Sequence, residues 1–198
     1  MSFAQSKGDS YVSATIGLEF GSQKTTTTIG SLSVSESQPL ATSFSLGAEY
    51  GYFVSNNLRL GFAIQVPYTC TPTTKDNDEW LKTKTVGIGF NPNVSYYFQI
   101  KDNFYYTPEI GCYYELGNYK ESLTSNTSYD NNYTGWSVYL NLLSFEFKVS
   151  KDFAIGVNLG TLQYITSKIK DKDTDTEINV SRFNCAFNKA GAHARFYF

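Results

Sequence analysis

The sequence has little of what most enzymes and most helical membrane proteins require. Its 198 residues include one histidine, one methionine and three cysteines, and only 17% of them are charged. The longest apolar runs are far shorter than the roughly 20 residues of a transmembrane helix. Cys70, Cys112 and Cys185 form no CxxC pair, which argues against a zinc site or a redox pair. Any membrane-spanning role must therefore depend on β-strands.

An excess of one charge is also missing. There are 16 Lys and Arg residues against 18 Asp and Glu residues. Nucleic-acid-binding domains carry a clear basic excess or a basic patch. We therefore expect no nucleic-acid partner.

Aromatic residues are abundant, and apolar and polar residues alternate along most of the chain. The sequence contains 16 Tyr and 15 Phe. A period of two predicts β-strands, and no segment has the apolar spacing of an amphipathic helix. We expect eight strands, over about residues 10–20, 40–54, 58–68, 85–99, 104–117, 135–149, 153–167 and 181–198.

The predicted connections are of two kinds. Three are tight, at 54–58, 100–104 and 149–153, and they carry the Asn, Asp and Ser residues typical of short hairpins. Four are long and polar, at about 21–37, 69–84, 118–134 and 168–180. In an up-and-down arrangement the tight turns lie at one end and the long loops at the other.

One domain accounts for nearly the whole chain. We expect residues 10–198 to form a single β-barrel domain, a size that such barrels commonly reach. Residues 1–9 are predicted to be the remnant of a signal-peptide region or a flexible tail. The triplet Ser2-Phe3-Ala4 fits the small-x-small pattern that precedes a signal-peptidase cleavage site.

One face of the predicted strands is free of charge, but alternation alone does not say whether it points inward or outward. A soluble lipocalin-like barrel would turn it inward around a ligand, and an outer-membrane barrel would turn it toward lipid. Glycines favour the second arrangement, because a narrow barrel needs small residues inside. They occupy the polar face at positions 17, 47, 51, 61, 87, 89, 111, 156 and 191. Aromatic residues also gather near the tight turns, as at a membrane interface.

The C-terminal stretch "AGAHARFYF" keeps the strand pattern to its last residue. Because lipid cannot satisfy an open sheet edge, the last strand of a membrane barrel must pair with the first. With its terminal Phe198, its Phe196 and its eight alternating strands, the sequence resembles the bacterial outer-membrane β-barrels of the small OmpA/OmpX type.

The resemblance implies a fold, a location and a set of partners. The fold is an eight-stranded antiparallel up-and-down transmembrane β-barrel with short periplasmic turns and long extracellular loops. The location is the outer membrane of a Gram-negative bacterium. The implied partners are the lipid bilayer, lipopolysaccharide and the outer-membrane assembly machinery, which would read Phe196 and Phe198 as a C-terminal assembly signal.

Charged side chains on the polar face would meet inside the barrel. The predicted lumen polar network consists of Glu19, Glu49, Arg59, Glu109, Glu146, Lys148, Lys189, His193 and Arg195. Paired carboxylates can perform acid–base catalysis, but charges of both signs in a small barrel more often form a satisfied plug. We favour the plug.

No catalytic, metal or cofactor site is expected. The single histidine, His193, lies near the periplasmic end and faces inward, whereas a membrane hydrolase would need it beside a nucleophile. The acidic stretch 171–177 lacks the EF-hand pattern, because Thr176 and Arg182 occupy the positions of its Gly and Glu.

The sequence thus predicts a non-enzymatic outer-membrane anchor whose exposed loops contact an unknown surface ligand or mediate adhesion. Loops rich in Tyr, Asn, Ser and Thr suit adaptable contacts. A narrow porin-like channel, a soluble lipocalin-like ligand-binding barrel and a lipid-modifying enzyme stay open as alternatives.

Overall fold

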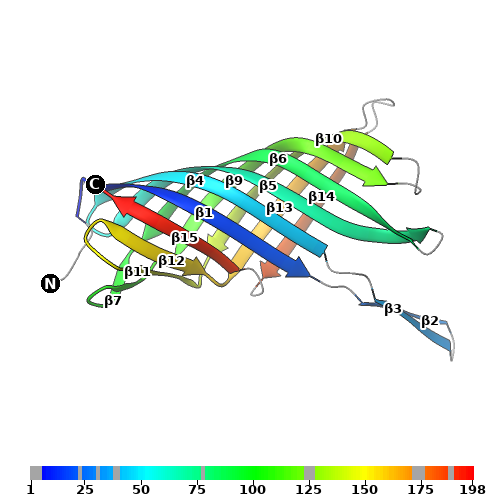
Figure 1. Ribbon diagram of the computed structural model, residues 1–198, viewed down its shortest axis with the longest axis horizontal. Helices are drawn as coiled ribbons and strands as arrows, with labels where there is room; N and C mark the ends of the chain where they lie inside the picture. The colour runs from blue at the N-terminus through cyan, green and yellow to red at the C-terminus, as the bar shows by residue number, and fades with distance from the viewer. Residues whose placement is uncertain are drawn as a thin grey trace.

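The computed structural model describes residues 6–21, 24–29, 32–37, 41–76, 79–122, 128–170, 177–186 and 190–198. Figure 1 shows long, slanted antiparallel strands that curl around a common axis. None of the described residues belongs to a helix long and apolar enough to cross a membrane.

The described residues form fifteen strands. Their bounds are β1 Ser10–Gly21, β2 Lys24–Ile29, β3 Leu32–Ser37, β4 Ala41–Ser55, β5 Leu58–Asp76, β6 Glu79–Tyr96, β7 Phe98–Lys101, β8 Phe104–Tyr106, β9 Glu109–Ser122, β10 Ser128–Asn141, β11 Ser144–Lys148, β12 Phe153–Asn158, β13 Thr161–Lys170, β14 Glu177–Ala186 and β15 Ala190–Tyr197.

Thirteen of these strands form one antiparallel sheet, and β2 and β3 form a separate hairpin. Strand β1 pairs with β4 on one side and with β15 on the other, so that Tyr11 lies opposite Tyr197. The predicted pairing of the first and last strands is therefore confirmed. Backbone hydrogen bonds in both directions between Ser10 and Phe198 continue this pairing to the final residue.

Several strands follow one another with only one or two residues between them. Tyr97 alone separates β6 from β7, and Leu142 and Leu143 separate β10 from β11. At this second break the inward face changes from odd positions, such as Tyr139, to even positions, such as Glu146. One extra residue in a strand forms a β-bulge. Beyond the bulge, the positions that face inward are shifted by one relative to a strict period of two.

The three tight turns are where the sequence predicted them. They connect β4 to β5, β7 to β8 and β11 to β12. Asn57 has a φ of 69°, a left-handed conformation that Asn adopts more easily than most residues. Figure 1 shows the C-terminus at the same end as β7 and the β11–β12 connection. We call this the turn end and the opposite one the far end.

The long polar connections differ from the prediction. Much of 69–84, 118–134 and 168–180 continues as strand, in β5, β6, β9, β10, β13 and β14, and most of 21–37 forms the β2–β3 hairpin. Thr, Tyr and Val favour extended structure even where no apolar face is required. The expectation of loops over these whole ranges was wrong, because a strand that lacks an apolar face can still keep its backbone pairing.

The outer surface of the sheet is apolar. Large side chains that are 36–57% exposed follow the outward positions of the strands, including Ile16, Leu46, Phe62, Ile88 and Ile110. Near the turn end, aromatic rings contact one another across strands. The centroid of the Phe98 ring lies 4.6 Å from that of Tyr96 and 5.8 Å from that of Tyr106, and Phe153 and Phe196 are 5.0 Å apart.

Residues 6–9 lie against the turn end. The Gly8 amide donates to the carbonyl of Phe53 at 2.9 Å, and the Lys7 amide donates to Oδ1 of Asn56 at 3.1 Å. The predicted domain boundary after residue 9 stays a prediction, and residues 1–5 lie outside the described residues.

Candidate functional site

Inward-facing side chains divide the interior into a filled part near the turn end and an open part toward the far end. Glycines on neighbouring strands make the filling possible. A Cβ atom on Gly51 would meet the ring of Tyr11, and one on Gly61 would meet Glu49 and Asn93. Large polar side chains therefore pack where the opposite strand has no side chain.

Arg59 is the centre of the first cluster in the filled part. Its side chain is 0% exposed. Its Nη2 atom lies 3.4 Å from Oε1 of Glu49, contacts the carboxylate of Glu109, and donates to Asn93 at 2.7 Å and to Ser95 at 2.6 Å. A buried guanidinium is stable only with such compensating partners.

Glu146 is the centre of the second cluster. It is also 0% exposed, and its carboxylate is paired with Arg195. It accepts hydrogen bonds from the hydroxyls of Tyr97 at 3.2 Å and Tyr197 at 2.5 Å, and Nε2 of His193 is 3.8 Å away.

The two clusters are connected. Nη2 of Arg195 lies 3.6 Å from Oε2 of Glu49, which is the partner of Arg59. The ring of Tyr11 lies between both cations, with its centroid 4.9 Å from Cζ of Arg195 and 5.5 Å from Cζ of Arg59. We call Glu49, Arg59, Glu109, Glu146, His193 and Arg195 the interior network.

Buried tyrosines complete the filled part, and the sequence analysis missed them. Tyr11, Phe53, Tyr97, Tyr105 and Tyr197 form a buried cluster with Ala154. Lys148, a predicted network residue, lies above the Tyr197 ring with its Nζ 4.4 Å from the centroid. A signal was present in the sequence, since these tyrosines occupy the same alternate positions as the charged residues. The sequence analysis considered aromatic residues only as a group near the tight turns at a membrane interface.

Two predicted network residues are not placed here. Lys189 lies outside the described residues, and Glu19 belongs to β1 but its side chain is not described.

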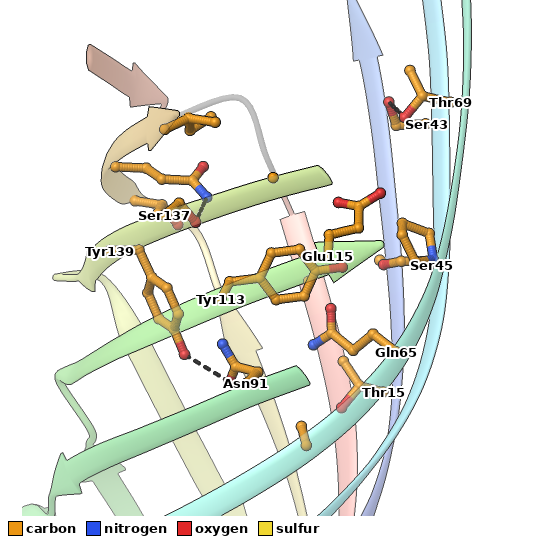
Figure 2. A pocket seen from close by; sticks show the side chains of 18 of the residues that line it. Thr15, Ser43, Ser45, Gln65, Thr69, Asn91, Tyr113, Glu115, Ser137 and Tyr139 are labelled. Atoms are coloured by element: carbon orange, nitrogen blue, oxygen red, sulfur yellow. Dashed lines mark hydrogen bonds between the residues drawn. The ribbon is translucent and has the colours of Figure 1, made fainter. Parts of the chain in front are cut away.

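The open part of the interior is a polar cavity of about 820 Å³. Glu49, Glu109, His193 and Arg195 of the interior network are among its lining residues. Hydroxyl, amide and tyrosine side chains line much of the rest, together with apolar side chains such as Leu18, Trp136 and Ile165. Figure 2 shows Thr15, Ser43, Gln65, Tyr113 and Glu115 around the cavity. The sequence predicted a narrow barrel with a plug of charged side chains, and it gave no indication of such a cavity. The difference arises because most of the inward positions at this level hold Thr, Ser or Gly.

The single histidine of the sequence, His193, belongs to the interior network. His193 contacts Glu146, and its Nε2 has no hydrogen-bond partner there. A Ser–His or Cys–His pair would require such a bond to a nucleophile. The described residues also contain no group of three or more His, Cys, Asp or Glu side chains that could hold a metal ion.

No family model and no curated relative matches the sequence. The fold is similar to that of the outer membrane protein OprG from Pseudomonas aeruginosa, with a TM-score of 0.55 and 11% identity over 100% of this chain and 99% of OprG. Neisserial surface protein A gives a TM-score of 0.44 at 19% identity, over 97% of this chain and 98% of that one.

Ail, the attachment invasion locus protein of Yersinia pestis, gives a TM-score of 0.44 at 12% identity, over 97% of this chain and 99% of Ail. At these identities the similarity to OprG concerns the fold alone. The chain therefore has the antiparallel, curled-sheet fold of the small bacterial outer-membrane β-barrels, as its sequence predicted.

Proposed function

We propose that this protein is an integral outer-membrane protein of a Gram-negative bacterium and acts as a non-enzymatic anchor that presents its far end to the outside. Eight strands would cross the membrane. The thirteen segments of the main sheet reduce to eight strands when β6 and β7, β8 and β9, β10 and β11, and β12 and β13, each separated by one or two residues, are joined, and β14 is joined to β15 across residues 187–189.

The outward apolar surface supports a membrane location. The outward positions from Leu60 to Val66 on β5 and from Val86 to Tyr96 on β6 hold apolar and aromatic residues only. A charge near the bilayer midplane would cost about 2–4 kcal/mol. A soluble lipocalin-like barrel would instead bury these side chains, and its surface would carry charge.

The two ends support an orientation with the turn end in the periplasm. Lys82 and Lys84 on β6 and Lys120 on β9 are exposed just beyond the apolar surface at the far end. Lys84 and Lys120 are direct cross-strand partners, and Asp130 on β10 also lies opposite Lys120. Because like charges in opposition destabilise a sheet, an anionic group between the two lysines would be favourable. Lipopolysaccharide phosphates at the outer leaflet would supply it.

Protease added to intact cells tests this orientation. We expect cleavage near 21–37, 69–84, 118–134 or 168–180, which lie toward the far end. Cleavage at the tight turns near Asn56, Asp102 or Lys151 would invert the orientation.

The filled part of the interior is the observation that favours an anchor over a channel. Arg59, Tyr11, Tyr97, Tyr105 and Glu146 are all nearly inaccessible. Hydrogen bonds and ion pairs hold Arg59 and Glu146, and the Tyr11 ring packs against Arg59 and Arg195. Ions could pass only if this part rearranged.

Recordings in planar lipid bilayers test the anchor against the channel. We expect the purified, folded protein to show no steady conductance. Stable and reproducible channel steps would favour the porin-like alternative, in which the polar cavity would form the entrance of a pore.

Contacts with the outside would be made by the strand extensions beyond the apolar surface and by the β2–β3 hairpin, which projects past the ends of β1 and β4 in Figure 1. Their Thr, Ser, Asn and Tyr content suits adaptable polar contacts. Adhesion would then depend on these segments. Deleting residues 24–37 should reduce the binding of whole cells to a host surface or polysaccharide and leave the amount of folded barrel unchanged.

A further inference from the structure

The open cavity contains one carboxylate that takes no part in the interior network. Glu115 on β9 lines the cavity together with Glu49 and Glu109. Both of those residues are paired with Arg59. Among the described side chains, no hydrogen bond or salt bridge reaches the Glu115 carboxylate, which Figure 2 shows directed into the open space.

The sheet register explains why Glu115 has no neighbour to pair with. Gly89 lies opposite it on β6, and Gly135 lies opposite it on β10. Neither glycine can supply a donor side chain. Glu115 therefore faces no cationic side chain among the described residues of either neighbouring strand, whereas Glu49, Glu109 and Glu146 are paired with Arg59 or Arg195.

Tyrosine rings cover these two glycines. A Cβ atom on Gly89 would meet the ring of Tyr113, and one on Gly135 would come within 2.6 Å of the Tyr133 hydroxyl oxygen. Both tyrosines also line the cavity. The Glu115 carboxylate is thus bordered by two phenol side chains, and Ser45 and Thr69 line the same space.

We propose that this cavity binds a small organic cation, an ammonium- or guanidinium-bearing molecule, with Glu115 as its counter-ion. Glu115 is half-buried. A carboxylate that is partly withdrawn from water without a partner carries a desolvation cost, and a bound cation relieves that cost. Tyrosine faces attract organic cations, and hydroxyl groups can accept their N–H hydrogen bonds. The volume of about 820 Å³ lies within the range of small-molecule sites.

A divalent metal ion fits this site less well. Calcium takes six to eight oxygen ligands, usually with several carboxylates. No cluster of three or more metal-ligating side chains is present among the described residues. The proposed site goes beyond the anchor function, since an anchor needs no ligand inside the barrel.

Three probes of similar size and different charge test the proposal: 2-hydroxyethylammonium, ethylene glycol and glycolate. They would be titrated into the folded barrel in an uncharged maltoside detergent, and the NMR signals of labelled tyrosine side chains would be followed. We expect saturable shifts of the Tyr113 and Tyr133 signals with the cation. The neutral and anionic probes should give no saturation.

Matched variants locate the binding. Glu115→Gln should weaken binding of the cation at least tenfold, whereas Asp152→Asn, the same charge change at an exposed tight turn, should leave it unchanged. Ser45→Lys retains Glu115 but introduces an ammonium group into the same cavity, and it should also abolish binding. The folded state of each variant is checked by heat-modifiable gel mobility.

Several results would overturn the proposal. They are equal affinity of folded Glu115→Gln and the parent protein, equal binding of glycolate and the cation, or tighter binding of calcium ions than of the cation. If Glu115→Gln did not fold, undiminished binding by Ser45→Lys would overturn it as well.

Discussion

Replacing Glu146 by Gln tests how strongly the interior network holds the barrel together. The substitution removes one negative charge with little change of shape. It leaves Arg195 fully buried, with Glu49 at 3.6 Å as the remaining carboxylate partner, and weakens the bonds from Tyr97 and Tyr197. Removing one partner of a buried pair typically costs 3–5 kcal/mol because the other charge stays behind. We therefore expect the free energy of unfolding to fall by about 3–5 kcal/mol.

The measurement is reversible urea unfolding in lipid vesicles, followed by the fluorescence of Trp80 and Trp136. Glu177→Gln is the matched control, since Nζ of Lys168 lies 2.7 Å from Oε2 of Glu177 but both side chains are largely exposed. Exposed ion pairs contribute about 0–1 kcal/mol. Double replacement with Glu146→Leu and Arg195→Met should recover most of the lost stability, because no unpaired charge remains.

The expected result is contradicted if Glu146→Gln lowers the free energy of unfolding no more than Glu177→Gln does. Equal costs would mean that water reaches Arg195 and Glu146, in which case the filled part of the interior would not be a seal.

Substitutions at the C-terminus, at an inward glycine and at the far end test other features of the barrel. Phe198→Asp should lower the amount of folded protein in the outer membrane, because it removes an exposed aromatic residue at the end of β15; a normal yield would show that the terminal residue is not an assembly signal. Gly51→Leu should clash with the Tyr11 ring and lower the folded yield, and adding Tyr11→Ala should restore part of that yield. If the yield is not restored, the loss does not come from the contact with Tyr11. Replacing Lys84 and Lys120 together by Gln should weaken binding to vesicles that contain lipopolysaccharide, measured by co-sedimentation, whereas Lys151→Gln at the turn end should not.

The outward face and the tight turns could be predicted from sequence because both follow from backbone geometry. A strand sends alternate side chains to opposite faces, so Leu60, Phe62 and Ile64 had to share a face whatever their partners were. Asn57 marks a turn because few other residues accept its positive φ.

The extent of the strands could not be predicted in the same way. Apolar–polar alternation is visible only where one face of a strand is apolar, and β5 and β6 continue beyond that region as far as Asp76 and Glu79. There the sequence is rich in Thr and Lys and has no regular apolar face, so that it looks like a loop although the backbone pairs as in a sheet.

Parity along each strand predicts which charged residues share a face, but it does not say which of them meet. Arg59 and Glu109 are 50 positions apart and come together only through the stagger of the strands. The cavity also depends on small inward side chains that lie on several strands at the same height along the barrel axis. The register of the paired strands decides which inward positions share a height, and the register cannot be read from a single sequence.

Fractionation of cell envelopes combined with heat-modifiable gel mobility tests the central claim, that this chain is a folded β-barrel of the outer membrane. The account predicts that the protein sediments with the outer-membrane fraction and that the unheated sample migrates at a different apparent mass from the boiled one. A protein found in the soluble fraction, with the same mobility before and after boiling, would contradict it and favour the soluble ligand-binding barrel.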